Sequence, residues 1–398
     1  MENDIKFPPE VVEIAKILDK HGKKAYAVGG CVRDSLMGRE PNDWDMTTDA
    51  SPEEMLSIFG EAGLHTIPTG LKHGTVTVMI DKKPYECTTF RIDGDYIDSR
   101  RPDKVTFTKN LADDLCRRDF TVNAMAADPL SVGDAVVDLY GGRNDIENKI
   151  IRCVGNSELR FTEDALRIIR AVRFASVLGF EIDRETAAAA EKLGSRLEFI
   201  SAERKSVELE KILLSSGADR GIRLLCELGL AKHVHEKIKL PKHKIASLPH
   251  SLPCRLASLF LGESDLSLSS MKLSNSLAQG TKTLADNELY NKCATFFGED
   301  GAANARYLLA KYGALAECAA ILRSDVAFAK IIADEREKCP CVSISQLDLN
   351  GHDLISLGIE QKKLSAIFDR LLIETIKAPE INKKEPLLAM AQKLARDI

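Results

Sequence analysis

The pattern of apolar residues changes once along this chain of 398 residues, near residue 145. Before that point, strand-like segments recur, such as Ala25–Val28 and a predicted hairpin of Gly74–Ile80 and Tyr85–Arg91. The turn of that hairpin is predicted at Asp81–Pro84. Beyond residue 145, apolar residues recur mainly at helical spacing. The whole chain of 398 residues is longer than one typical domain. We therefore expect an α+β fold first and an all-α arrangement afterwards.

The composition is that of an ordinary globular protein. Hydrophobic residues make up 44% of the chain and charged residues 29%, which excludes disordered and collagen-like chains. The sequence shows no signal peptide, and no run approaches the ~18 apolar residues of a membrane span. The ten cysteines are scattered without a C-x-x-C pair, which indicates reduced thiols rather than disulfides or a zinc site. We expect a cytoplasmic protein that does not bind membranes.

Charge is distributed unevenly between the two halves of the chain. Residues 1–200 contain 27 Lys and Arg against 35 Asp and Glu, a net charge of −8. Residues 201–398 contain 28 against 25, a net charge of +3. This asymmetry is compatible with an acidic, cation-binding part beside a part that meets phosphate.

A glycine pair, Gly29 and Gly30, lies between a predicted strand and a predicted helix that extends to about Met37. Glycines let the backbone approach a ligand closely, and the N-terminus of the helix offers free N–H groups to phosphate. Arg33, in the first turn of this helix, can add a bidentate contact. The alternative is an ordinary turn before a helix.

Two aspartates, Asp43 and Asp45, follow in a segment predicted as the strand Asn42–Thr48. Because side chains alternate along a strand, both carboxylates leave the same face, about 7 Å apart at the backbone. Two carboxylates and triphosphate oxygens would form a Mg²⁺ site suited to phosphoryl or nucleotidyl transfer. A solvated loop is the alternative, and the combination with the glycine pair favours the functional interpretation.

Glu86, in the predicted hairpin, is a candidate third carboxylate of the metal site. An exposed glutamate on a strand is an equally good interpretation. Residues 92–104 after the hairpin are almost entirely polar and predict a mobile loop.

Two later clusters combine arginines with acidic residues. In Asp114–Ala124, adjacent arginines beside Asp119 indicate either a surface ion-pair lattice or a clamp for sugar and phosphate. The spacing of residues in Glu163–Phe174 predicts one helix through the whole segment. This segment carries three arginines. A salt bridge from Glu163 to Arg167 at i, i+4 is the simple interpretation, but three arginines on a partly apolar helix favour a ligand.

Five segments in this order closely resemble the five motifs of class II CCA-adding enzymes, the tRNA nucleotidyltransferases. The segments are Ala25–Thr48, Leu115–Ala124, Val137–Arg152, Glu163–Phe174 and Ile200–Arg204. The resemblance is strong over about residues 10–230 and weaker to the C-terminus. Bacterial poly(A) polymerases share these motifs, but Gly70–Val76 looks like the tRNA enzymes. Arg100–Asp103 resembles a flexible-loop element of enzymes that add the final A.

The resemblance implies a role for each matching residue. Asp43 and Asp45 would ligate Mg²⁺, with Glu86 as a further candidate for the catalytic site. Triphosphate contacts would come from the glycine pair and Arg33, and ribose or phosphate contacts from Arg118. The residues expected to bind the nucleotide base or sugar are Asp164, Arg167, Arg170 and Arg173, and the helical positions support Arg173 least.

The implied activity is addition of CCA to tRNA 3′ ends from CTP and ATP. The implied fold is a nucleotidyltransferase head of the polymerase-β type, followed by helical parts. Their expected bounds are 1–145 for the head, 146–215 for the neck, 216–330 for the body and 331–398 for a tRNA-binding tail. A poly(A) polymerase, a partial CC- or A-adding enzyme and a non-catalytic RNA-binding protein remain as alternatives, and oligomeric state is not predicted.

Overall fold

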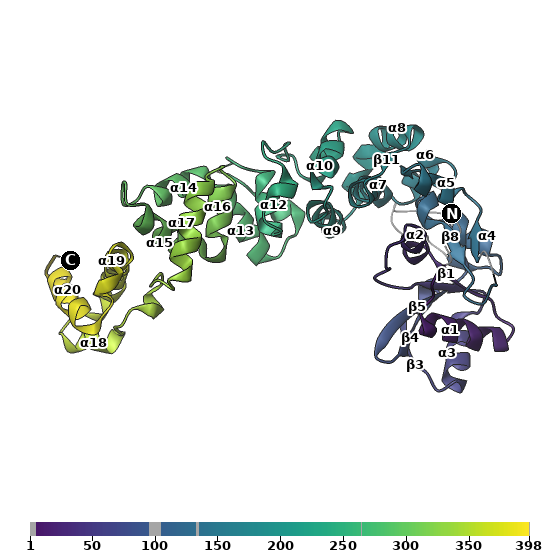
Figure 1. Cartoon of the computed structure of the whole chain (residues 1–398), viewed down its shortest axis with the longest axis horizontal. Coiled ribbons are helices and arrows are strands. Elements are labelled where there is room, and N and C mark those ends of the chain that lie inside the picture. The colour runs from purple at the N-terminus through teal and green to yellow at the C-terminus, as the bar shows by residue number, and fades with distance from the viewer. Residues whose placement is uncertain (1–4, 95–104, 133–134, 264, 398) are drawn as a thin grey trace. The chain divides into compact units, whose positions relative to one another are not determined.

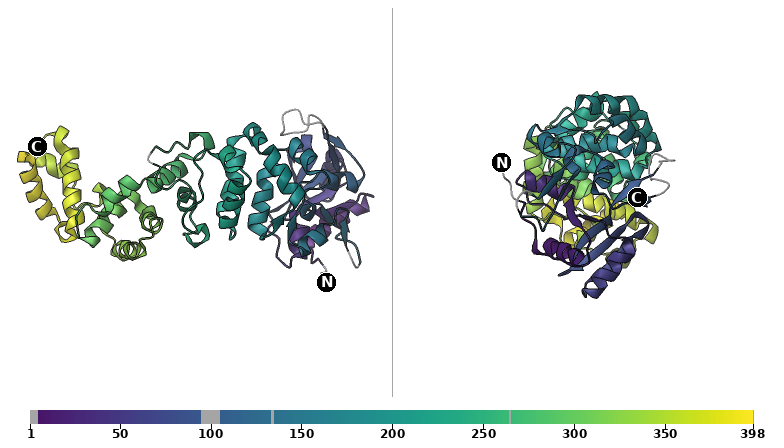
Figure 2. Two further views of the ribbon diagram at one scale, coloured as in Figure 1. Left: turned by 90° about the horizontal axis from the view of Figure 1, so that it is seen from above. Right: turned by 90° about the vertical axis from the view of Figure 1, so that its right-hand side faces the viewer.

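The computed structural model describes residues 5–94, 105–132, 135–263 and 265–397. The chain forms two compact units, Met1–Glu236 and Lys237–Ile398. In the described ranges, every strand belongs to the first unit (Figures 1 and 2). No helix in these ranges combines the length and apolar character needed to cross a membrane.

A seven-stranded sheet forms the centre of the first unit. Its strands are β1 (Ala25–Val28), β2 (Met46–Thr48), β3 (His65–Gly70), β4 (Thr75–Ile80), β5 (Lys83–Thr89), β8 (Met125–Ala127) and β9 (Val136–Asp138). They stand in the order β3, β4, β5, β2, β1, β8, β9. Neighbouring strands are antiparallel except for the parallel pair of β2 and β5. Two further pairs are β6 (Arg91–Asp93) with β7 (Val105–Phe107), and β10 (Ile150–Ile151) with β11 (Glu181–Ile182).

Helices α1 (Pro9–Lys20) and α3 (Pro52–Glu61) pack against the sheet in one apolar core (Figure 1). Val11, Ile14 and Leu18 of α1 are fully buried, at the spacing of one helix face. Burial of each such side chain contributes about 1.5–3 kcal/mol. Helix α3 begins at Pro52, because Ser51 caps it with a reciprocal pair of hydrogen bonds to Glu54.

The predicted strand β1 and the predicted hairpin are confirmed. The hairpin turn is tighter than expected, because Asp81 and Lys82 both adopt positive φ angles of 49° and 65° and β5 already begins at Lys83. The predicted strand Asn42–Thr48 was too long, since only Met46–Thr48 pair with β1. Of the predicted loop 92–104, residues 95–104 lie outside the described residues.

Helices dominate the remainder of the first unit, as expected. They are α2 (Gly30–Leu36), α4 (Leu111–Cys116), α5 (Gly142–Glu147), α6 (Ser157–Glu163), α7 (Leu166–Leu178), α8 (Arg184–Leu193), α9 (Ala202–Leu213), α10 (Ala218–Glu227) and α11 (Ala231–Val234). Helix α7 packs closely on α10, where a β-carbon on Gly221 would come within 2.7 Å of Ser176 Oγ. The single helix predicted for Glu163–Phe174 is wrong, because the chain breaks at Asp164 (φ −134°, ψ 103°) between α6 and α7.

The second unit is helical throughout its described residues. Its helices are α12 (Leu252–Ser258), α13 (Asn275–Ala285), α14 (Asn287–Ala294), α15 (Gly301–Tyr312), α16 (Ala316–Ile321), α17 (Val326–Glu337), α18 (Gly351–Ser356), α19 (Leu364–Lys377) and α20 (Lys384–Asp397). One apolar cluster joins α12 to α17, and another joins α18 to α20. The expected α+β fold with an all-α continuation is therefore confirmed.

Candidate functional site

Gly29 connects β1 to α2 in a conformation that favours glycine, with a φ angle of +83°. A β-carbon at this position would lie 3.1 Å from Nη1 of Arg118. The absence of a side chain therefore lets the Arg118 guanidinium lie over the start of the helix. Gly30 is close to a different arginine, since a β-carbon there would lie 3.7 Å from Nη2 of Arg33.

Asp43 and Asp45 lie in the extended segment that leads into β2. Both are exposed, whereas Trp44 is half-buried and Met46 is buried, so the predicted alternation of faces is confirmed. The carbonyl of Asp45 accepts a hydrogen bond of 2.9 Å from the Val28 amide, which fixes this residue beside the end of β1.

A cavity of about 180 Å³ opens beside Asp45. Its lining consists of Val28, Asp45, Met46, Thr75, Glu86, Thr88, Arg91, Arg117 and Arg118. The structure thus brings Glu86 to the same cavity as Asp45 and Arg118, while Asp43 lies outside this lining. The lining therefore combines two carboxylates with three guanidinium groups.

The carboxylates repel one another. Partial burial and the negative charges of Asp43 and Glu86 raise the pKa of Asp45 to about 6, against an opposing effect of Arg118. A hard divalent cation would relieve this repulsion, and carboxylate oxygens suit it, so the donor set fits. Among the described residues, no group of three or more His, Cys, Asp or Glu side chains is placed to hold a metal ion. Further ligands would therefore have to come from a substrate or water.

A second cavity, of about 240 Å³, shares two arginines with the first. It is lined by Arg117, Arg118, Asp119, Asp164, Arg167 and Arg170. Four of the predicted nucleotide-binding residues therefore meet here, although they come from segments about 50 residues apart. The shared arginines Arg117 and Arg118 connect the two cavities.

The residues of this second cavity hold one another in place. Asp119 accepts a hydrogen bond of 2.9 Å from Arg170 Nε and a second from Arg170 Nη2. Burial alone would raise the pKa of Asp119, but the charge and hydrogen bonds of Arg170 outweigh it and hold the pKa at about 2. Asp164 ends α6 and accepts hydrogen bonds from Arg204 Nη2 and from the Leu166 amide at the start of α7, both of 3.0 Å.

Arg167 connects α7 to the segment of the paired arginines. Its Nη2 donates to the carbonyl of Arg117 at 2.7 Å, and its Nη1 donates to Glu163 at 2.7 Å. The i, i+4 salt bridge expected as the simple interpretation is therefore present, in addition to the position at the cavity.

Arg33 and Arg173 are in the lining of neither of these two cavities. Arg33 is buried, bonds to Asp34, and donates from Nη1 to Asn123 at 2.6 Å. Arg173 pairs with Glu208 of α9 at 2.9 Å. Burial, with the charge of Arg170, lowers the pKa of Arg173 to about 10.

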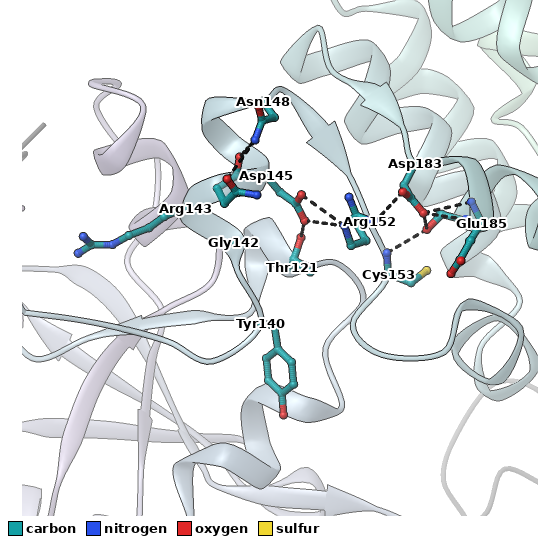
Figure 3. A network of polar contacts seen from close by, with 12 residues as sticks. Thr121, Tyr140, Gly142, Arg143, Asp145, Asn148, Arg152, Cys153, Asp183 and Glu185 are labelled. Carbon is teal, nitrogen blue, oxygen red and sulfur yellow. Dashed lines mark hydrogen bonds and ion pairs between the residues drawn. The ribbon is translucent and has the colours of Figure 1, made fainter.

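A polar network connects Thr121, two residues after Asp119, to α5 and α8 (Figure 3). The buried Asp145 of α5 accepts hydrogen bonds from Thr121 Oγ1 at 2.6 Å and Arg152 Nε at 3.2 Å. Arg152 Nη1 reaches Asp183 at 2.6 Å, and Asp183 caps α8. The short helix that starts at Thr121 also holds Asn123, the partner of Arg33. The network therefore joins the sheet to the following helices at the site.

Among the charged residues that line the cavities, sequence reasoning missed three: Arg91, Arg117 and Asp119. Arg117 and Asp119 belong to a charged cluster that the sequence singled out, and only Arg118 was chosen from it. Arg91 is the last residue of a predicted strand, and its sequence neighbourhood gives little indication of a functional role. Its Nη1 donates to the carbonyl of His73 at 2.6 Å, which places it at the cavity rim.

Two segments of the chain match known protein families. Residues 25–152 match the family described as "Poly A polymerase head domain", and residues 179–240 match "Probable RNA and SrmB- binding site of polymerase A". The CCA-adding enzyme of Geobacillus stearothermophilus is 48% identical over 225 residues, which cover 56% of this chain and 54% of that protein. The chain thus spans about half the length of the first curated relatives it matches.

Two other relatives match over most of their length. The CCA-adding enzyme of Bacillus subtilis is 34% identical over 365 residues, covering 87% of this chain and 88% of that protein. The crystal structure of the Bacillus stearothermophilus CCA-adding enzyme in complex with CTP has a TM-score of 0.81 and 31% identity, covering 98% of this chain and 99% of that one. The chain therefore belongs to the family of CCA-adding enzymes.

Proposed function

We propose that this protein adds CCA to the 3′ ends of tRNA, using CTP and ATP and releasing pyrophosphate. One observation carries the proposal: Arg117 and Arg118 connect a cavity with carboxylates to a cavity lined by Asp164, Arg167 and Arg170. A nucleoside triphosphate also has two parts to be bound, because its reacting phosphates and its base must be held at neighbouring places. Two connected cavities suit such a ligand. The CTP complex of a relative 31% identical in sequence supports this assignment.

In the proposed reaction, the 3′-hydroxyl of tRNA attacks the α-phosphate of the nucleotide. Asp43 and Asp45 would hold Mg²⁺, which supplies activation of the hydroxyl and stabilisation of the leaving oxygen. Arg117 and Arg118 would neutralise the phosphates and orient them for in-line displacement. Glu86 faces the same cavity, where it would add a further carboxylate to the acidic side.

Asp164 and Arg167 are the proposed readers of the base. Cytosine and adenine each present an amine donor beside a ring-nitrogen acceptor, which a carboxylate and a guanidinium match. Uracil and guanine reverse this order, so each mismatch leaves a polar group unpaired at a cost of about 1–3 kcal/mol. Arg170 would hold the nucleotide beside them, while Arg33 and Arg173, which line neither cavity, would act by positioning Asn123 and Glu208.

The proposal also assigns the parts of the chain. Residues 1–145 would form the catalytic head, 146–215 the neck with the base-reading helix, 216–330 the body, and 331–398 a tail that binds tRNA by shape and backbone. The proposed substrates are cytoplasmic molecules in bacteria, the source of the relatives, so the proposal includes a cytoplasmic location.

The test uses three tRNA transcripts, ending before CC, before A and after CCA, each incubated with one labelled NTP at a time and Mg²⁺. We expect C on the first, A on the second and no addition to the third. Continued A addition to the third transcript would indicate a poly(A) polymerase, and activity on only one transcript a partial enzyme.

Two variants and one condition complete this test. Asp43→Ala and Asp45→Ala should each abolish addition while tRNA affinity stays within a few-fold, and EDTA should stop the wild-type reaction. Asp19→Ala, at an exposed position of α1, is the matched control. RNA binding without incorporation by the wild type would replace the proposal with the non-catalytic alternative.

A further inference from the structure

Asp114 of α4 is a fully buried carboxylate beside the two cavities, and it lines neither of them. Its Oδ1 accepts hydrogen bonds from Arg117 Nε at 3.0 Å and from Arg117 Nη2 at 2.7 Å. Its Oδ2 accepts one from Arg118 Nη2 at 3.2 Å and a longer one from Thr47 Oγ1 at 3.4 Å. One carboxylate therefore ties both shared arginines to β2, the strand that follows Asp45.

The two arginines depend on this anchor because they lie at the boundary of the cavities. Arg118 passes over Gly29, and its Nε is buried without a hydrogen-bond partner among the described residues. Burial alone would raise the pKa of Asp114, but the charges of Arg118 and Arg117 hold it below its ordinary value. The anchor is therefore ionised at neutral pH, and it fixes Arg118 from one side only.

We propose that Asp114 is a positioning residue for the nucleotide: it acts through Arg117 and Arg118, which it holds in place to receive the phosphates. The inference rests on the function proposed above, since it concerns the same site. Fixing an arginine side chain costs rotamer entropy, and ordering it before binding removes that cost from the binding step. Asp114 itself does not touch the nucleotide, because it has no exposed surface.

The substitution Asp114→Asn tests this role. Asparagine has nearly the same size, but its amide has no charge and presents donors to guanidinium groups that are themselves donors. We expect the dissociation constant for ATP, measured by equilibrium dialysis of the full-length protein without tRNA, to rise at least tenfold. The KM for CTP and for ATP in the addition assay should rise more than kcat falls.

A double-mutant cycle separates positioning from a merely structural role. In a background of Arg117→Ala with Arg118→Ala, Asp114→Asn should change ATP affinity by less than threefold, because the groups it acts through are absent. An equal loss in both backgrounds would overturn the proposal. If the asparagine variant does not fold, Asp114→Glu replaces it, because glutamate keeps the charge but moves it by one methylene. The loss of ATP affinity is then compared between the two backgrounds in the same way.

The neighbouring Asp113 provides the matched control. It lies on the same helix but bonds to Thr108 Oγ1 and Asn110 Nδ2 instead of the arginines. Asp113→Asn should leave ATP affinity within twofold, and a tenfold loss there would contradict a specific role for Asp114. If the wild type binds ATP and follows this pattern without adding CCA to tRNA, the positioning role stands and the proposed reaction fails. If the wild type binds no ATP, both fail.

Discussion

Asp119→Asn should lower the free energy of unfolding of the first unit by about 2–3 kcal/mol at neutral pH. Asp119 is about 10% exposed, bonds to Arg170 through Oδ2, and accepts a hydrogen bond of 3.1 Å from Asn123 through Oδ1. These contacts hold its pKa at about 2, compared with an ordinary value of 3.8. The difference corresponds to about 2–3 kcal/mol of preference for the ionised form, and asparagine resembles the protonated form that lacks it.

The pH dependence gives this prediction a second, independent part. Because the pKa is lower in the folded state, the stabilisation is complete above the unfolded pKa near 4 and is lost as the pH falls towards about 2. The difference in the free energy of unfolding between wild type and Asp119→Asn should therefore be full at pH 7 and shrink to about half of that value at pH 3.

The single tryptophan of the chain makes this measurement selective. Trp44 lies in the first unit, with its ring centroid 5.7 Å from that of Phe7, so its fluorescence during urea unfolding reports on that unit. Asp19→Asn, at an exposed position, is the control and should change stability by less than about 0.5 kcal/mol. A loss below about 0.5 kcal/mol for Asp119→Asn at pH 7, or a loss undiminished at pH 3, would refute the reasoning.

Three further substitutions test separate parts of the structure. Gly29→Ala should cost more stability than Gly38→Ala in the same fluorescence assay, since both positions have positive φ angles but only the first would crowd a guanidinium group; equal costs would contradict this. Asp164→Ala should lower CTP and ATP incorporation and narrow their advantage over UTP, and unchanged discrimination would place base reading elsewhere. Arg306→Met should destabilise the second unit by about 3 kcal/mol in calorimetry, because it leaves the buried Glu335 without the 2.7 Å contact; a loss below 1 kcal/mol would contradict it.

The strands that the sequence predicted well are those whose pattern is local. Ala25–Val28 and the hairpin each contain their own apolar alternation, and the structure confirms them. The length of β2 depends instead on its partner, because β1 ends at Val28 and the chain turns away at Gly29. Apolar alternation continues back to Trp44, so the sequence alone could not show where pairing stops.

At Asp164, the preference of aspartate for helix ends indicated a break, but the continuous apolar periodicity outweighed it in the prediction. Apolar spacing continues across the break, and neither glycine nor proline marks it, so periodicity predicted one helix. Aspartate favours positions at helix ends, and here Asp164 ends α6 while its Oδ1 accepts the hydrogen bond of the Leu166 amide at the start of α7. The break turns Asp164 out of the helix and towards Arg204, a partner 40 residues away that local spacing cannot reveal.

The site was predicted as a set of chemical groups but not as a set of contacts. The charged clusters were recognised locally, whereas Arg170 meets Asp119 across 51 residues and Arg33 meets Asn123 across 90. These pairings follow from the packing of α7 and α2 against the segment after α4, which one sequence does not encode in any local pattern. Arg33 was expected at a phosphate; it is buried and lines neither cavity, and its phosphate contact stays a prediction.

The shared anchor has a consequence for how the two cavities work together. Arg117 and Arg118 line both cavities and bond to the same carboxylate of Asp114. A movement of either arginine in one cavity therefore also alters the lining of the other cavity. Arg167 adds a further connection, since it donates to the carbonyl of Arg117 from the helix that would read the base. Under the proposed function, a base that fits poorly at Arg167 would therefore disturb the groups that hold the phosphates. Selection between nucleotides would then act on the rate of transfer as well as on binding, which is how differential stabilisation of the transition state produces specificity.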